Sequence, residues 1–317
     1  MSDRKMTLED IDPELRDAFA KMPNLRLDRL WVRWLVRRLS RLQYRTQSDP
    51  GVQTSKQKLT HADVRIYHPK TNGNRAGLFW IHGGGMIMGD AAMNDPQCNR
   101  YARELGLTVV SANYRLAPEH PYPAAIDDCY EAWRWFLQHA EQLGVDPERI
   151  AIAGQSAGGG LAAALCQRTR DSGVQAPAAQ LLIYPMLDDR TALRDDLTEI
   201  EHILWNNRNN RFGWSAYLGS DVEAIESTPD WAVPGRCNDL SNLPPTWIGV
   251  GDKDLFLEED EAYAIALQAA DVECTFVKAP SAPHAFDALV TGAMVSRNFL
   301  ESADDFLKRH LTADPKL

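Results

Sequence analysis

The stretch RIAIAGQSAGGGLAAALCQR, residues 149–168, constrains this chain more than any other. An apolar run typical of a strand leads into GQSAG at 154–158, and a helical stretch rich in Leu and Ala follows at once. A G-x-S-x-G sequence between a strand and a helix predicts a strained turn that lifts the serine hydroxyl above the sheet. The helix N-terminus beside it favours developing negative charge. We therefore expect Ser156 to be a nucleophile.

A serine hydroxyl needs a base to accept its proton, and in this setting the partners follow in the order Ser, Asp or Glu, His. Three histidines lie after Ser156. His310 is in a terminal helical stretch, and His202 is in a segment that interrupts the strand pattern. His284 follows an apolar strand pattern in a short loop, where a sheet would present a base. We expect His284 to be the general base.

Two pairs of aspartates are candidates for the acid that orients this histidine. Asp252 and Asp254 lie just after an apolar strand pattern and before a helical one, and either could stabilise a charged imidazole. Asp188 and Asp189 occupy an analogous place after another strand pattern. For that second pair, loop capping or a salt bridge is the simpler explanation.

A second glycine cluster, HGGG at 82–85, also follows an apolar run. Attack on an acyl carbon creates an oxyanion, and each preorganised N–H group aimed at it can lower the barrier by ~3 to 4 kcal/mol. Glycine allows such close approach because it has no Cβ. We expect the N–H groups of Gly83, Gly84 and Ala157 to form this oxyanion hole, with a structural role for His82. A bulky residue at Gly84 should then lower turnover far more than stability.

The wider pattern is that of an α/β fold. Short apolar runs alternate with helical patterns, which predicts crossover connections around a mainly parallel sheet, with ligands at the carboxyl ends of its strands. The predicted strands are 63–69, 77–82, 107–114, 149–154, 179–185, 246–251 and 273–279. The predicted helices lie near 122–143, 157–170, 259–270 and 293–310.

Two segments do not fit this alternation and are expected to form a helical cap over the sheet. The first lies within residues 1–50, and the second spans 190–236 and is rich in Trp, Asn and Asp. The catalytic domain would then comprise 51–189 and 237–317. Apolar cap residues are candidates for lining a substrate pocket, although ordinary packing within the cap is the preferred interpretation for any single one. The candidates are Trp31, Trp34, Ile203, Leu204 and Trp205.

The first cap segment also carries a basic stripe at helical spacing: Arg29, Arg33, Arg37, Arg41 and Arg45. Such a stripe fits a helix that lies on a membrane surface. It equally fits a solvated helix face whose apolar side packs on the core or lines a pocket. The second interpretation is preferred because the whole chain is acidic.

Composition limits the remaining function classes. The 317 residues are 44% hydrophobic and 25% charged, typical of a globular protein, and the net charge of -10 gives no general reason to bind nucleic acid or anionic membranes. The five cysteines include no C-x-x-C pair, which argues against a disulfide framework or a zinc site. The charged N-terminus has no signal-peptide core, so we expect a cytoplasmic location.

Five stretches of the chain together carry a family resemblance: HGGG at 82–85, YRLAPEHPYPA at 114–124, GQSAGG at 154–159, DLFLEEDEAYA at 254–264 and APHAFD at 282–287. The chain resembles the hormone-sensitive-lipase-like branch of the α/β-hydrolase fold, the bacterial carboxylesterases also called family IV. In similar enzymes the acid opens the D-[LP]-[LF]-x-[DE]-E run, so the resemblance favours Asp254 over Asp252. It also implies a two-part cap.

The chain departs from the family pattern at Gln155, at Asn113, where Asp is usual, and at Ala285, where Gly is usual. None of these changes removes a reacting group. The resemblance implies a serine hydrolase that cleaves short- to medium-chain carboxylic esters through an acyl-enzyme. It requires no cofactor or metal and allows a homodimer. An amidase, formamidase or lactonase with the same triad is an alternative, as is a non-catalytic small-ligand receptor on this fold.

Overall fold

A computed structural model describes residues 5–43 and 49–311. Its centre is an eight-stranded sheet in the order β1-β2-β4-β3-β5-β6-β7-β8. β2 pairs antiparallel with both β1 and β4, and the other pairs are parallel. The strands are β1 Val52–Lys58, β2 Asp63–Pro69, β3 Gly77–Ile81, β4 Thr108–Asn113, β5 Ile150–Gln155, β6 Ala179–Ile183, β7 Thr246–Gly251 and β8 Cys274–Ala279.

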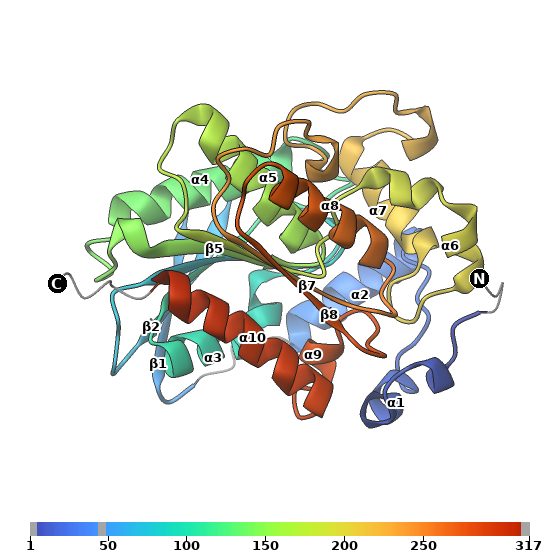
Figure 1. Ribbon diagram of the computed structural model, residues 1–317, viewed down its shortest axis with the longest axis horizontal. Coiled ribbons are helices and arrows are strands. Elements are labelled where there is room, and N and C mark those ends of the chain that lie inside the picture. The colour runs from blue at the N-terminus through green and yellow to red at the C-terminus, as the bar shows by residue number, and fades with distance from the viewer. Residues whose placement is uncertain (1–4, 44–48, 312–317) are drawn as a thin grey trace.

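Helices cover both faces of this sheet (Figure 1). α4, α5 and α8 lie on one face, and α3 and α10 lie on the other. The α-helices are α1 Pro13–Phe19, α2 Leu30–Gln43, α3 Asp95–Leu105, α4 Ala124–His139, α5 Ala157–Ser172, α6 Asp195–Ile200, α7 Asn207–Leu218, α8 Leu257–Ala269, α9 Phe286–Leu289 and α10 Met294–Leu311. The 3-10 helices are η1 Leu8–Asp10, η2 Ala91–Asn94, η3 Pro147–Arg149, η4 Asp189–Leu193, η5 Val222–Ala224 and η6 Pro234–Arg236.

The expected α/β fold is confirmed, and the seven predicted strands correspond to β2 through β8. The central strands β3 and β6 are buried along their whole length, which explains why they read as continuous apolar runs. β1 was not predicted, because an edge strand buries little: only Val52 of VQTSKQK is buried. α3 was not predicted either, because its sequence DPQCNRYAREL is largely polar.

Two sets of helices lie outside the regular alternation. α1 and α2 precede the sheet, and a second set, from η4 to η6, separates β6 from β7. We call residues 190–236 the insertion. α2, α6 and α7 lie in the right-hand half of the molecule in Figure 1. α2 and α7 are joined by the Arg33 guanidinium, which lies 4.8 Å from the centre of the Phe212 ring.

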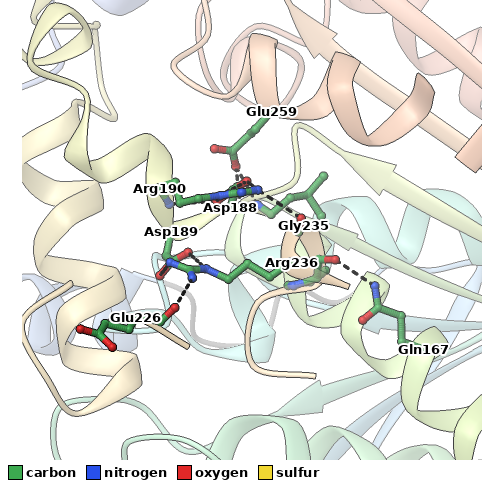
Figure 2. A network of polar contacts seen from close by, with 10 residues as sticks. Gln167, Asp188, Asp189, Arg190, Glu226, Gly235, Arg236 and Glu259 are labelled. Carbon is green, nitrogen blue, oxygen red and sulfur yellow. Dashed lines mark hydrogen bonds and ion pairs between the residues drawn. The ribbon is translucent and has the colours of Figure 1, made fainter. Parts of the chain in front are cut away.

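A polar network holds the base of the insertion where its two ends meet (Figure 2). Asp189, fully buried, accepts hydrogen bonds of 2.6 and 2.9 Å from Arg236. Asp188 caps the following 3-10 helix by accepting from the Arg190 N–H at 2.9 Å. Glu259 of α8 accepts from the Asp188 N–H at 3.3 Å, so the network reaches the helix after β7. Asp188 and Asp189 thus have the capping and salt-bridge contacts that their sequence context indicated.

Candidate active site

Ser156 stands at the turn between β5 and α5, with φ +56° and ψ -125°. Such a conformation is strained for a residue with a Cβ and is kept only where the surrounding structure imposes it. The neighbouring backbone is very close, because a Cβ on Gly158 would lie 2.2 Å from the carbonyl oxygen of Ile81. Gly158, the second glycine of G-x-S-x-G, is therefore required because the backbone at the end of β3 leaves no room for a side chain. Ser156 is buried at this turn, with 7% of its surface exposed.

Ser156, His284 and Asp254 form a continuous chain of hydrogen bonds. The Oγ of Ser156 lies 2.9 Å from Nε2 of His284, and Nδ1 of His284 lies 2.8 Å from Oδ2 of Asp254. All three residues are buried. With Nδ1–H donating to the carboxylate, Nε2 is the ring atom left free to accept the serine proton. The structure thus brings together the three residues that the sequence placed far apart.

The other candidates for these positions lie elsewhere. Asp254 also accepts a hydrogen bond from the Phe256 N–H at 3.0 Å, which fixes its orientation, whereas the nearest cation to Asp252 is Lys253 at 3.9 Å. His310 lies 3.4 Å from Glu273. None of the contacts in the described part of the chain joins Asp252 or His310 to Ser156.

His202 is closer to the triad than its sequence context indicated. It is buried in the insertion, and burial lowers its pKa, while the charge of Asp254 acts in the opposite direction. The charge of His284 also contributes to lowering the pKa of His202. His202 therefore lies within electrostatic range of both residues. A lone histidine in an irregular segment offers no sequence signal for this placement.

Aromatic side chains pack around His284. The rings of Tyr184 and Phe256 meet the imidazole edge to face, with centroids at 4.7 and 5.4 Å. The Tyr184 hydroxyl donates to Asp287 at 2.8 Å, and burial raises the pKa of Asp287. These supporting residues were not predicted, because Tyr184 follows a different strand and only the parallel pairing of the sheet brings it to His284.

The glycine loop after β3 lies against the serine turn. A Cβ on Gly83 would be 3.0 Å from the carbonyl oxygen of Gln155 and 3.2 Å from Cβ of Ser156. Gly84 has φ +115°, and a Cβ there would lie 2.1 Å from the carbonyl oxygen of Met88. Within the described residues, the N–H groups of Gly83, Gly84 and Ala157 donate no hydrogen bond. These three N–H groups are therefore free to bind an anionic oxygen.

His82 holds this glycine loop in place. It is fully buried, its Nδ1 lies 2.8 Å from the carbonyl oxygen of Gly83, and its ring stacks on Tyr114 with centroids 4.2 Å apart. Burial lowers the pKa of His82 to about 4. The imidazole is thus neutral at neutral pH. The neighbouring Asn113, at one departure from the family pattern, accepts a hydrogen bond from the Ala91 N–H at 3.2 Å, which needs no charge.

Of the expected pocket residues, Trp205 lies closest to the glycine loop. A Cβ on Gly85 would be 2.2 Å from Cη2 of Trp205, so the indole covers the loop. Ile203 and Leu204 are half-buried beside it.

The two tryptophans of α2 do not join this group. Trp31 and Trp34 are 64% and 58% exposed, and no contact in the described part of the chain links them to Ser156. The expectation that the apolar side of this helix packs on the core holds only in part. Val32 is buried in the core and Val36 packs against it, but Arg33 and Arg37 share this inward face. The side chain of Arg41 and all of Arg45 lie outside the described residues.

No group of three or more His, Cys, Asp or Glu side chains within residues 5–43 and 49–311 is arranged to hold a metal ion. No helix in that part of the chain is long and apolar enough to cross a membrane.

A mainly parallel sheet that presents a serine after β5, an aspartate after β7 and a histidine after β8 is typical of serine hydrolases of the α/β-hydrolase fold. A family profile described as alpha/beta hydrolase fold matches residues 78–288. The chain is 36% identical to Esterase LipI of Mycobacterium tuberculosis over 254 residues, 79% of this chain and 76% of the relative. It is 37% identical to Carboxylesterase NlhH of the same species over 231 residues, 72% of each chain.

Solved structures agree with these relatives. The structure titled Bacterial Heroin Esterase superposes with a TM-score of 0.89 at 34% identity and covers 97% of this chain and 100% of its own. The chain belongs to the hormone-sensitive-lipase-like carboxylesterases of the α/β-hydrolase fold, as the five motifs indicated. It is a carboxylesterase.

Proposed function

We propose that Ser156, His284 and Asp254 are the catalytic triad of this esterase and that catalysis proceeds through an acyl-enzyme. The observation that carries this proposal is the chain of two hydrogen bonds, 2.9 and 2.8 Å long, from the serine through the histidine to the aspartate. The histidine takes the serine proton as the hydroxyl attacks the ester carbon, and Asp254 stabilises the imidazolium that forms.

The tetrahedral intermediate places a negative charge on the former carbonyl oxygen. In the proposal, the free N–H groups of Gly83, Gly84 and Ala157 bind this oxyanion. His284 then protonates the departing alkoxide, and the alcohol leaves. A water molecule, deprotonated by His284, attacks the acyl-enzyme, and the acid product is released with Ser156 restored.

The proposed substrates are carboxylic esters with short to medium acyl chains. We assign the first cap segment, within residues 1–50, and the insertion to a two-part cap over the catalytic domain. Trp205, packed on the glycine loop, supports a restricted acyl site, with Ile203 and Leu204 beside it. Turnover across p-nitrophenyl esters from acetate to palmitate measures this preference, and a lactone and an arylamide in the panel measure the competing activities.

A cytoplasmic location is part of the same proposal. All five cysteines are free thiols, and none is fully exposed. Free cysteines are the usual state of proteins in a reducing compartment.

Two substitutions test the triad directly. Ser156→Ala should lower turnover of p-nitrophenyl butyrate by about 10⁴-fold or more and abolish labelling by a fluorophosphonate, while Ser220→Ala on the surface leaves both unchanged. Asp254→Asn should lower turnover by about 10⁴-fold, because the imidazole loses the partner that sets its tautomer, and Asp252→Asn should have little effect. Wild-type protein that neither labels nor turns over any ester would instead indicate a ligand-binding role.

A further inference from the structure

Helix α2, pale blue in Figure 1, turns a large apolar surface toward solvent. We call the five exposed apolar residues among its described side chains the α2 outer face. They are Leu30 at 70% exposure, Trp31 at 64%, Trp34 at 58%, Leu35 at 41% and Leu39 at 53%. Contiguous exposed apolar patches of this kind mark interaction sites, whereas single exposed apolar residues do not.

The orientation of α2 is fixed by its opposite, inward face. Arg33 is only 5% exposed and donates to the carbonyl oxygen of Leu27 at 2.9 Å. Arg37 donates to the carbonyl oxygens of Ile87 at 2.8 Å and Ala117 at 2.7 Å. Rolling the helix to bury its tryptophans would break these charge-assisted bonds and leave buried carbonyls without partners. The fold therefore holds the apolar face outward.

A surface hollow beside this face carries excess positive charge. It is lined by Leu30, Arg33, Trp34, Arg37, Arg38 and Glu119. Glu119 pairs with Arg37 at 2.9 Å, so one of the three guanidinium charges is balanced. The buried Nε of Arg33 has no hydrogen-bond partner among the described residues. Arg38 is exposed and lies 5.3 Å from the centre of the Trp34 ring.

The charge of α2 contrasts with that of the whole chain. Residues 30–43 contain four arginines and no Asp or Glu, although the chain as a whole has a net charge of -10. An uncompensated positive hollow next to exposed Trp and Leu side chains complements an anionic, apolar partner. A face-to-face contact between two copies would bring the arginines of both helices together, which is unfavourable.

We propose that the α2 outer face binds reversibly to the surface of an anionic phospholipid bilayer. Trp31, Trp34 and the leucines enter the boundary between headgroups and acyl chains, and the arginine-lined hollow receives a lipid phosphate. A helix of 14 residues lies along the membrane plane in this arrangement and does not span it. The proposal is independent of the catalytic assignments, since lipid binding is measured without turnover.

Flotation of the full-length protein with large unilamellar vesicles tests the proposal. Wild type should bind vesicles of phosphatidylcholine with about one third phosphatidylglycerol at least about tenfold more strongly than phosphatidylcholine alone. Trp31→Ser/Trp34→Ser should weaken that binding by about tenfold or more, because the inserted apolar area is lost. Arg38→Gln should weaken it by about fivefold, and raised salt should weaken wild type further.

Ile265→Ser is the matched control, since Ile265 is 61% exposed on α8, and its binding should equal that of wild type. Circular dichroism melting confirms that each variant is folded. The proposal is wrong if wild type fails to float with anionic vesicles, or if the double tryptophan variant floats as wild type does. A third outcome also contradicts the proposal: wild type does not bind vesicles, and light scattering shows a dimer of wild type but a monomer of the double variant. The α2 outer face would then be an interface between two copies.

Discussion

Ala285 stands where glycine is usual in the family, and its backbone conformation makes this difference unfavourable for stability. It directly follows His284 and has φ +61° and ψ +23°, in the left-handed region where a Cβ is unfavourable by roughly 1 to 2 kcal/mol. Glycine avoids this strain but loses more backbone entropy on folding, about 0.5 to 1 kcal/mol. The usual glycine of the family is thus explained by backbone conformation.

Replacing Ala285 by Gly should therefore raise the free energy of unfolding by about 0.5 to 1 kcal/mol. Urea denaturation followed by circular dichroism measures this change. Ala288→Gly, at an exposed helical position of α9, should have the opposite sign by a similar amount, because no strain is relieved there. A loss of stability in both variants would show that the left-handed conformation carries no penalty here.

At the scale of elements, two glycines of the loop after β3 differ in how well they would tolerate a side chain. Gly84 has a positive φ and no room for a Cβ, whereas Gly83 has no positive φ and a Cβ there would make only moderately tight contacts. The expectation that a bulky residue at Gly84 would affect turnover far more than stability is therefore revised. Any side chain there should disturb the fold as well as the oxyanion site.

Gly84→Ala should lower the free energy of unfolding by about 3 kcal/mol or more, since strain at positive φ and the clash with Met88 add. Gly83→Ala should cost about 1 kcal/mol or less. Both should lower esterase turnover. Urea unfolding and turnover of p-nitrophenyl butyrate measure the two effects separately, and equal stability losses at the two positions would contradict this account.

The base of the insertion depends on a buried ion pair. Asp189 is fully buried, and Arg236 is its bidentate partner. Arg236→Met should lower the free energy of unfolding by about 3 to 5 kcal/mol, because it leaves an uncompensated buried charge. Adding Asp189→Asn to that variant should restore part of the loss, as a double-mutant cycle in urea would show.

The neighbouring pair of Asp188 and Arg190 is the control for this cycle. The Arg190 side chain is 59% exposed, so solvent screens the pair, and Arg190→Met should cost less than about 1 kcal/mol. Equal costs for Arg190→Met and Arg236→Met would mean that the burial of Asp189 has no energetic consequence.

For the whole molecule, two cores on opposite faces of one sheet enclose ionisable groups that water cannot reach. His82 is the clearest case, with its pKa lowered from 6.5 to about 4 by burial. As pH falls below 6.5, the unfolded chain binds a proton at this position and the folded protein does not. The contribution of neutral, buried His82 to the free energy of unfolding is therefore complete above pH 6.5 and is lost progressively as the pH falls to about 4.

The expected loss from His82 over that interval is about 3 kcal/mol. In His82→Gln, the free energy of unfolding should fall less steeply between these pH values, whatever the variant costs at neutral pH. Urea denaturation of both proteins at several pH values measures the difference in slope. Parallel curves would show that His82 does not take part in acid sensitivity.

Much of the fold follows from local pattern. The central strands and the helices after them are continuous in sequence, so their apolar periods predicted them. Ser156 was predictable for the same reason, because the strand, the turn and the helix that position it are adjacent residues. Polar elements such as β1 and α3 were missed, since an edge strand needs few apolar residues and the buried face of α3 includes the polar Asp95 and Asn99.

By itself, the sequence determined the fold class, the family and the serine turn, because these depend on residues close together in the chain. Only the tertiary structure decided which side chains from different strands meet, such as Tyr184 with His284. It also decided that α2 faces outward with its tryptophans. Apolar spacing defines two sides of a helix, but which side is buried depends on the contacts available, here the carbonyl groups that Arg33 and Arg37 bind.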